Sequence, residues 1–170
     1  SDAAVTPYVQ LSKIYSDEGM LWILEDAPAE ISVTIPSEFT LIKNRAGQYL
    51  YDSKNGVALY GNPGTKDTSY QWRIEQDGES YTIVNRFTGH YLTIENSRPF
   101  LECGVGITEA AHWKISVAPV SNYSILANAD SPDKYINTNA GLGFAQCTVL
   151  SNEKATVQWC FETPAGEAPD

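Results

Sequence analysis

Basic side chains are scarce in this sequence, and long apolar runs are absent. Its 170 residues contain 11 Lys and Arg against 21 Asp and Glu, so the net charge is −10. An acidic surface repels phosphate backbones and anionic lipids, which argues against nucleic acid and membrane surfaces as partners. No run of about 18 apolar residues occurs, so we expect no membrane insertion. The first residues also lack the basic and apolar segments of a signal peptide, so we expect either an intracellular protein or the mature form of an exported chain.

Cysteine and histidine are too few and too scattered to indicate a metal site. The three cysteines, Cys103, Cys147 and Cys160, cannot all pair within one chain, and no CxxC motif brings two of them together. The two histidines, His90 and His112, lie far apart in the sequence. The motifs HExxH, GxSxG and the P-loop are absent, and no carboxylate spacing indicates a general acid and base. We therefore expect no cofactor and no enzymatic activity.

The sequence does contain a threefold internal repeat. Two sets of aromatic residues mark it, namely Trp72, Trp113 and Trp159, and Tyr49, Tyr91 and Tyr135. The tryptophans are 41 and 46 residues apart and the tyrosines 42 and 44, so two independent landmarks keep one period. A period of this size indicates supersecondary units that bury their apolar faces only against one another.

Each repeat predicts four short strands. It opens with alternating residues such as Phe39-Thr40-Leu41, passes through a turn rich in Gly, Asp or Pro, and ends in the strand that contains the tryptophan. Ile74, Ile115 and Phe161 follow the tryptophans by two residues. Because residues two apart share a strand face, each pair should point into the core.

Three such units predict an all-β fold of twelve strands, a β-trefoil, in which a closed six-stranded barrel is capped by three hairpins. A propeller also uses four-stranded units, but three blades are fewer than the usual number of about 4–8. We assign residues 38–163 to the trefoil. Residues 1–37 predict an N-terminal β-hairpin extension that packs on the barrel, because YVQLSKIY and MLWILED flank SDEG. We expect residues 164–170 to be a disordered tail or a linker.

The phrases GQYLY and GHYLT, each followed by a tryptophan strand such as QWRI, resemble the ricin-type β-trefoil lectins and related carbohydrate-binding modules of bacterial glycosidases. The resemblance covers about three-quarters of the chain. It implies a domain that binds carbohydrate and catalyses no reaction.

Several sugar-binding positions of those lectins are changed in this chain. The lectins place an Asp at the end of the second strand, where the matching residues are Tyr51, Thr93 and Asn137. Their third strand supplies a stacking aromatic, where the matching residues are Tyr60, Glu102 and Gln146. The resemblance therefore predicts a divergent member in which the usual galactose site is not retained.

The disulfides of the lectins, which join the second and third strands of a unit, are also not retained. Cys103 and Cys147 match the third-strand position, but their partner positions hold Tyr91 and Tyr135. We expect three buried free thiols, since free cysteine behaves as a small apolar residue. A disulfide between Cys160 and one of the others is the alternative.

A sugar site needs an exposed aromatic ring for the apolar face of the sugar and carboxylate or amide groups for its hydroxyls. On this basis the candidate ligand-binding residues in the first and third repeats are Asp52, Asn55, Tyr60, Asn62, Gln71, Asn137, Asn139, Phe144 and Gln146. Each has a structural alternative, because Asn and Asp are ordinary turn residues and the simpler interpretation of Tyr60 is a packed strand residue.

We therefore expect a non-catalytic carbohydrate-binding module of a secreted or cell-surface bacterial protein, with glycan or polysaccharide as its partner and a neighbouring catalytic domain as a second. Three weak sites, one in each repeat, would together provide avidity. The alternative is a structural or protein-interaction trefoil, similar to fascin-like or protease-inhibitor trefoils, that binds no sugar.

Overall fold

The structure, a computed structural model, describes residues 33–63, 67–94, 99–120 and 122–164. These residues form twelve strands and three short 3₁₀ turns, so the all-β prediction is confirmed. No helix in these ranges is long and apolar enough to cross a membrane. The hairpin predicted within residues 1–37 and the tail predicted at 164–170 lie mostly outside the described residues.

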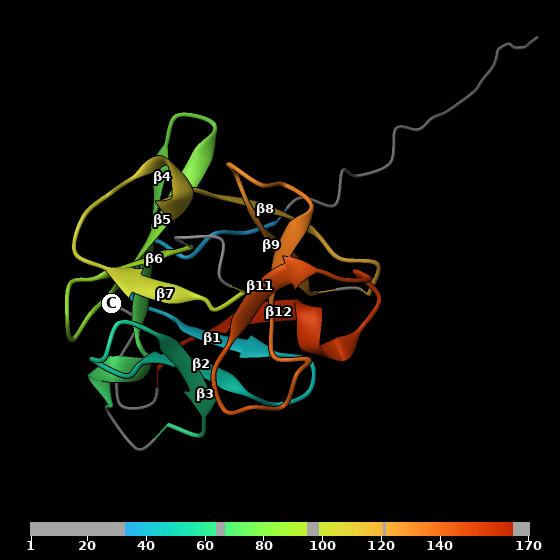
Figure 1. Cartoon of the computed structure of the whole chain (residues 1–170), viewed down its shortest axis with the longest axis horizontal. Coiled ribbons are helices and arrows are strands. Elements are labelled where there is room, and N and C mark those ends of the chain that lie inside the picture. Colours follow the sequence, from blue (N-terminus) through green and yellow to red (C-terminus); the bar gives the residue numbers. More distant parts are fainter. Residues whose placement is uncertain (1–32, 64–66, 95–98, 121, 165–170) are drawn as a thin grey trace, which may run out of the picture. The chain divides into compact units, whose positions relative to one another are not determined.

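Three lobes repeat one order of elements (Figure 1). Lobe one contains β1 (Leu41–Asn44), β2 (Tyr49–Asp52), β3 (Ala58–Gly61), the 3₁₀ turn η3 (Thr68–Tyr70) and β4 (Trp72–Asp77). Lobe two contains β5 (Ser80–Asn85), β6 (Tyr91–Thr93), β7 (Glu102–Gly104), η4 (Glu109–Ala111) and β8 (Trp113–Val117). Lobe three contains β9 (Ser124–Asn128), β10 (Lys134–Asn137), β11 (Gln146–Val149), η5 (Ala155–Val157) and β12 (Gln158–Glu162).

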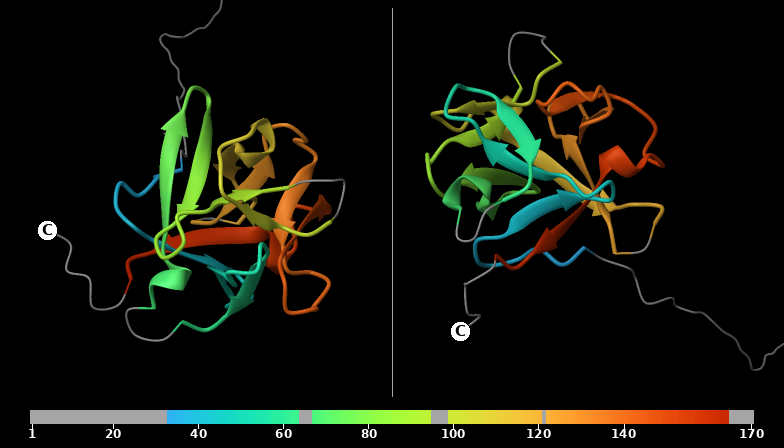
Figure 2. Two further views of the ribbon diagram at one scale, coloured as in Figure 1. Left: turned by 60° about the vertical axis from the view of Figure 1, so that its left-hand side comes forward. Right: turned by 90° about the horizontal axis from the view of Figure 1, so that it is seen from below.

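The first and last strands of the lobes form the barrel. Antiparallel pairings join β4 to β5, β5 to β8, β8 to β9, β9 to β12 and β12 to β1, and the β5–β8 pairing is the single pair of Tyr81 with Trp113. Between β1 and β4 the path of named strands is open, and a single bridge joins Thr40 to Trp72 through two hydrogen bonds of 2.8 and 2.9 Å. The barrel that we predicted to be closed is therefore completed by one residue pair outside the named strands. The long β4–β5 hairpin projects away from the β2–β3 hairpin (Figure 2).

The remaining strands form the hairpins β2–β3, β6–β7 and β10–β11, which meet at the pseudo-threefold axis. The Ala58 N–H donates to the Leu101 carbonyl at 2.9 Å, Leu101 donates to Ala145 at 3.0 Å, and Ala145 donates back to Ala58 at 2.9 Å. All three residues are fully buried. This ring of backbone hydrogen bonds shows that the backbones of the three lobes are arranged equivalently around the axis, and the β-trefoil prediction is confirmed.

The core is built around one tryptophan from each lobe. Trp72, Trp113 and Trp159 are all 0% exposed, as the sequence predicted. Each indole Nε1–H donates to a backbone carbonyl in the second strand of its own lobe, at 3.1, 3.0 and 2.8 Å, and the acceptors are Leu50, Leu92 and Ile136. The residues two positions after the tryptophans also belong to or pack against this core. Because a buried N–H must find an acceptor, these hydrogen bonds fix the depth of each ring.

The ring at the axis corrects our alignment of the third strands. The sequence comparison placed Tyr60 with Glu102 and Gln146, whereas the structure matches Leu59 with those two residues and Tyr60 with Cys103. The β2–β3 turn is shorter than the corresponding turns of the other lobes. Because strand faces alternate, a register error of one residue assigns a side chain to the wrong face.

All three cysteines are free thiols, as predicted. Cys103 and Cys147 are buried, but Cys160 is only half-buried, which corrects the expectation of three buried thiols. Cys103 pairs across its hairpin with Leu92 and not with Tyr91, again one residue from the predicted register. Burial raises the pKa of Cys103 well above its ordinary value and that of Cys147 to about 12.

A second threefold set of hydrogen bonds holds the turn after the first strand of each lobe against the preceding lobe. In each case a backbone N–H of the turn donates, at 2.8 Å, to the carbonyl of the residue directly before a tryptophan. The donor and acceptor pairs are Arg86 with Gln71, Arg45 with Gln158, and Ala129 with His112. Every first turn therefore contributes to the surface of a neighbouring lobe.

Candidate functional site

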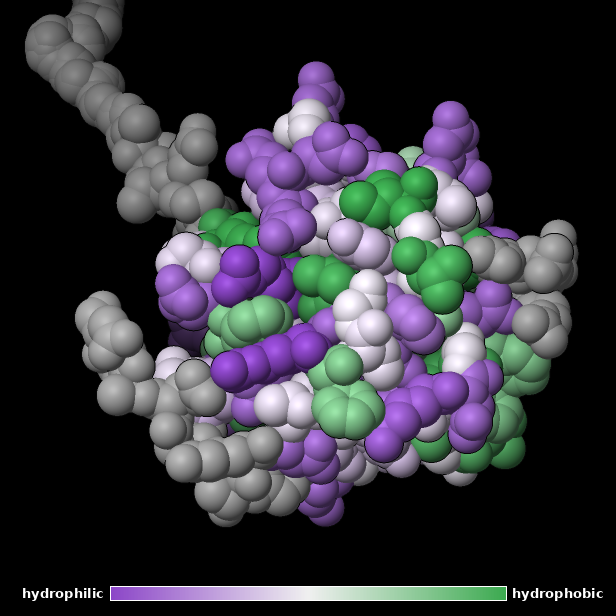
Figure 3. Space-filling view, turned by 90° about the vertical axis from the view of Figure 1, so that its left-hand side faces the viewer, coloured by the Kyte–Doolittle hydropathy of each residue, from purple (hydrophilic) through white to green (hydrophobic). Residues whose placement is uncertain are grey.

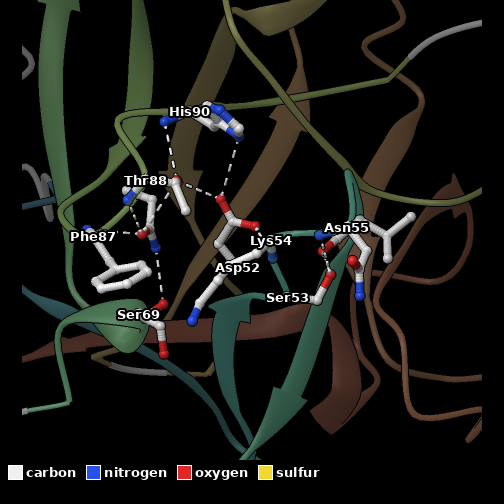
Figure 4. Close-up of polar contacts among 10 residues, drawn as sticks. Asp52, Ser53, Lys54, Asn55, Ser69, Phe87, Thr88 and His90 are labelled. Atoms are coloured by element: carbon white, nitrogen blue, oxygen red, sulfur yellow. Dashed lines mark hydrogen bonds and ion pairs between the residues drawn. The ribbon is translucent and has the colours of Figure 1, made fainter.

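An open pocket of about 430 Å³ lies on lobe one where the first turn of lobe two meets it. The end of β2, the turn that follows, the segment that enters η3 and one residue of lobe two supply its walls. The lining residues are Tyr51, Asp52, Ser53, Lys54, Asp67, Thr68, Ser69 and Phe87. Figure 4 shows how several of these side chains lie around Asp52.

The β2–β3 turn forms the first wall of the pocket. The Asp52 carboxylate accepts a hydrogen bond from the Lys54 N–H at 2.8 Å, and Ser53 Oγ donates to the Val57 carbonyl at 2.8 Å. Lys54 has a φ of 69°, in the left-handed region. This conformation costs a residue with a Cβ about 1–2 kcal/mol relative to the right-handed one. Strain of this kind is concentrated at functional sites, so a lysine in this position supports a role for the turn.

The segment that enters η3 forms the second wall. Asp67 is the N-cap of η3, and its Oδ1 accepts hydrogen bonds from the Ser69 N–H at 3.1 Å and the Ser69 hydroxyl at 2.6 Å. Its Oδ2 makes no hydrogen bond to any residue that the structure describes. The rings of Tyr51 and Tyr70 pack against each other nearby, with centroids 4.6 Å apart. The wall thus presents a carboxylate oxygen and hydroxyl groups on a packed aromatic base.

Phe87 provides the exposed aromatic surface of the pocket. Its side chain is 53% exposed, and its N–H donates to Asn85 Oδ1 at 2.9 Å. Lys54 Nζ lies 4.4 Å from the centroid of the Phe87 ring, within the range of a cation–π contact. Phe87 belongs to lobe two in the sequence, but in space it completes the pocket of lobe one.

Asp52 joins the two lobes beneath this pocket. It is 1% exposed, and its Oδ2 accepts a hydrogen bond from the Thr88 hydroxyl, next to Phe87. His90 Nδ1 lies 3.8 Å from the same oxygen and has no hydrogen-bond partner among the described residues. Figure 4 shows Asp52 between Thr88 and His90 on one side and the Lys54 turn on the other. One buried carboxylate therefore fixes both the β2–β3 turn and the turn that presents Phe87.

The pocket offers an apolar ring beside oxygen and ammonium groups. These are the elements that hold a sugar, which has an apolar C–H face and a rim of hydroxyls. No group of three or more His, Cys, Asp or Glu side chains in the described ranges is arranged to hold a metal ion.

The structure distributes the predicted residues of the first repeat over different environments. Asp52 lines the pocket, but its carboxylate is used internally. Gln71 is 1% exposed, and its Oε1 accepts a hydrogen bond from the Arg86 guanidinium at 2.6 Å. Asn55 and Asn62 are exposed and lie outside the lining of the pocket.

Tyr60 packs against lobe three. Its hydroxyl accepts a hydrogen bond from the Gly143 N–H at 3.1 Å, and its own N–H donates to the Gly143 carbonyl at 3.2 Å. The ring is therefore held in a contact between lobes, in agreement with the packed alternative that the sequence left open. The binding role of Tyr60 stays a prediction.

The predicted residues of the third repeat lie in another lobe from the pocket. Asn137 is fully buried, and its side chain makes hydrogen bonds within lobe three. Its Oδ1, for example, accepts a hydrogen bond from the Asn139 N–H at 3.0 Å. Asn139 is exposed. Phe144 makes an edge contact with Phe100, with ring centroids 4.7 Å apart, and Gln146 is half-buried in β11. Their binding roles also stay predictions.

Sequence reasoning missed most of the pocket lining, above all Phe87 and Lys54. The signal for Phe87 was present, since the first turns of lobes one and two both begin with Asn-Arg but continue with Ala46 and Phe87 respectively. An exposed aromatic residue at a turn position that holds Ala46 in lobe one and Asp130 in lobe three indicates a role other than folding.

Comparison with known proteins agrees with this description. A model of the family described as ricin-type beta-trefoil lectin domain-like matches residues 68–159. Erythema protein SVEP of Simulium vittatum is 28% identical over 80 residues, which are 46% of this chain and 53% of that protein. The chain thus matches about half the length of this curated relative.

Solved structures share the fold. An endo-β-galactosidase from Clostridium perfringens that releases GlcNAcα1-4Gal is 29% identical with a TM-score of 0.67, over 73% of this chain and 32% of that chain. A ricin B-like lectin of Macrolepiota procera, solved in complex with lactose, is 16% identical with a TM-score of 0.65, over 78% of this chain and 99% of that chain. With the family match covering more than half of its residues, the chain belongs to the ricin-type β-trefoil lectin domain-like family.

Proposed function

We propose that this domain is a non-catalytic carbohydrate-binding module that holds a saccharide in the lobe-one pocket. The observation that carries the proposal is that one open pocket combines the exposed ring of Phe87 with the carboxylate of Asp67 and the hydroxyl of Ser69. Membership of a lectin-like family supports the same function at the level of the family.

The roles of the groups follow from the chemistry of a sugar ring. The apolar face of the sugar stacks on Phe87, and Asp67 Oδ2 accepts a hydrogen bond from a sugar hydroxyl. Lys54 Nζ donates to a second sugar oxygen. Asp52 is a positioning residue in this scheme, because its carboxylate is buried and holds both turns in place.

The size of the ligand sets the affinity to expect. A monosaccharide has about 12 non-hydrogen atoms, and about 0.3 kcal/mol per atom gives a binding free energy of about 3.6 kcal/mol, which corresponds to a Kd of about 2 mM. Binding this weak escapes detection at micromolar ligand. Titration at millimolar sugar, or a densely coated glycan surface, is therefore the appropriate assay.

We also propose the context in which the module works. It would belong to a secreted or cell-surface bacterial protein and bring that protein to glycan or polysaccharide. The likeness to part of a clostridial endo-β-galactosidase, of which the match covers 32%, supports a neighbouring catalytic domain as a partner. Because the fungal lectin was solved with lactose bound, galactosides are the first sugars to test.

The test is a glycan array followed by titration of any hit with the Phe87→Ala variant. Loss of a stacking contact of about 1–1.5 kcal/mol should weaken binding roughly tenfold. Ile107→Ala is the matched control, because Ile107 is 51% exposed, close to the 53% of Phe87, and lies outside the pocket lining. Equal affinity of wild type and Phe87→Ala would refute the assignment of the pocket.

The alternative of a protein-interaction trefoil is favoured by one loop. Val105 is 84% exposed and Ile107 51% exposed between β7 and η4. On the face drawn in Figure 3, however, hydrophobic side chains form small patches separated by hydrophilic ones. Stable protein interfaces bury a larger continuous surface. Binding of no glycan on a broad array would refute the proposed function and favour this alternative.

A further inference from the structure

We infer that the chain has one saccharide site of this kind and not three, because among the described residues only lobe one receives an aromatic ring from one particular position of its neighbour's first turn. The inference rests on the proposed function and concerns the number of sites and the residue that decides it. In each first turn, the backbone N–H of Arg45, Arg86 or Ala129 donates to the residue before a tryptophan. We call the next residue of the turn the platform position, and it holds Ala46, Phe87 and Asp130 in lobes one, two and three.

The equivalence of these positions follows from hydrogen bonds. Each platform residue directly follows a backbone N–H that donates at 2.8 Å to the residue before the tryptophan of the preceding lobe. In two lobes the side chains repeat this pattern as well. The Arg86 guanidinium donates to Gln71 Oε1 at 2.6 Å, and the Arg45 guanidinium donates to Gln158 Oε1 at 2.6 Å. Ala46 therefore lies against lobe three as Phe87 lies against lobe one.

The chemistry of the platform position differs between the lobes. Phe87 presents a ring that is 53% exposed. Ala46, which faces lobe three, presents a single methyl group, and Asp130, which faces lobe two, presents a carboxylate; both are exposed. Neither can stack on the C–H face of a sugar, so the apolar half of the recognition is missing in both places.

The N-cap of each 3₁₀ turn shows a second difference. Asp67 caps η3 with its side chain and keeps one carboxylate oxygen without a hydrogen bond in the described ranges. The corresponding residues, Thr108 and Lys154, make no side-chain cap bond. In lobe three, Thr156 Oγ1 donates to Asn139 Oδ1 at 3.3 Å, so these polar groups already pair with each other. Ring and acceptor therefore occur together in lobe one alone among the described residues.

A single composite site changes how the protein would engage a polysaccharide. One chain would bind one saccharide unit and would gain no avidity from its own threefold symmetry. Tight attachment would then need several chains or a second domain. The site would also depend on the contact between lobes one and two, since each lobe alone holds only part of it.

The experiment measures stoichiometry and location together. Isothermal titration of the full chain with the sugar identified on the array should give one ligand per chain. In ¹⁵N-resolved NMR spectra, amides of 67–69 and 85–89 should shift on titration, while amides of 44–48 and 154–156 should not. A stoichiometry of two or three, or equal shifts in lobe three, would overturn the inference and leave the proposed function standing. Absence of binding to any sugar would instead refute the proposed function.

A gain-of-function variant tests the platform position itself. Ala46→Phe combined with Lys154→Asp adds both the ring and the capping carboxylate that lobe three lacks, and should raise the stoichiometry from one to two. Ala46→Leu combined with Lys154→Asp adds apolar volume without an aromatic face and should leave the stoichiometry at one. If the double variant with Ala46→Phe and Lys154→Asp also binds one ligand, the platform position does not decide which lobe binds.

Discussion

Replacing each core tryptophan by phenylalanine, one at a time, tests the physical equivalence of the three lobes. Trp72, Trp113 and Trp159 are all fully buried, and each indole donates one hydrogen bond, of 2.8–3.1 Å, to a second-strand carbonyl. Phenylalanine keeps the apolar ring but has no N–H and fills less space. Each variant should therefore lose one buried hydrogen bond and part of the packing in the core.

The magnitude can be worked out from these two losses. A buried carbonyl that loses its donor costs about 1–3 kcal/mol. The phenylalanine side chain is smaller by roughly 40 Å³, which at about 24 cal/mol per Å³ of cavity adds about 1 kcal/mol. Each substitution should thus lower the free energy of unfolding by about 2–4 kcal/mol. For a domain of this size the melting temperature should fall by roughly 10 °C.

Urea unfolding followed by far-ultraviolet circular dichroism is the suitable assay, because the tryptophan fluorescence itself changes in each variant. Val149→Ala is the control; its side chain is 64% exposed, and surface changes of this kind alter stability by about 0.5 kcal/mol or less. The three tryptophan variants should agree within about 1 kcal/mol. A variant that costs less than about 1 kcal/mol would contradict the argument that every lobe anchors the core through its indole.

Two further predictions concern titratable side chains. His112 Nε2 lies 2.7 Å from Asp77 Oδ2 and its Nδ1 lies 2.8 Å from the Thr108 carbonyl; the hydrogen bond to Asp77 is the largest cause that raises the pKa of His112. The protonated form is therefore favoured by folding, so this stability is complete below the usual histidine pKa of about 6.5 and is lost as pH rises through the higher folded value. Because the pair is partly exposed, its effect should be small. In urea unfolding, wild type should be more stable than Asp77→Asn by at most about 1 kcal/mol at pH 5.5, and the two should be equally stable at pH 8.5. Equal unfolding midpoints of wild type and variant at both pH values would refute the pairing. In native protein, a thiol reagent should label the half-buried Cys160 first and the two buried cysteines only on unfolding; fast labelling of all three would contradict the observed burial.

The fold could be read from the sequence because its determinants are local and repeated. The alternation around Phe39-Thr40-Leu41, the turn residues and the spacing of the tryptophans each belong to one lobe, and three copies reinforce the same prediction. The register of β3, and with it the alignment of Tyr60, could not be read from the sequence. The length of the turn between β2 and β3 sets this register, and the pattern of apolar residues did not reveal a register shift of one residue.

The candidate site was less accessible to sequence reasoning. Asn, Asp and Gln residues such as Asn137 and Gln71 looked suited to sugar hydroxyls, but in the structure both are buried and hydrogen-bonded within the protein. A polar side chain in a small barrel is as useful for satisfying buried backbone and side-chain groups as for binding a ligand. Composition alone does not separate these two uses.

The sequence by itself determined a threefold all-β domain with an indole core, because strand alternation and burial of large apolar rings are encoded within each repeat. The pocket was decided by tertiary contacts, because its walls come from segments of lobe one and its exposed ring comes from lobe two. Packing of these lobes, with Asp52 bonded to both turns, is what brings Phe87 beside Asp67 and Lys54.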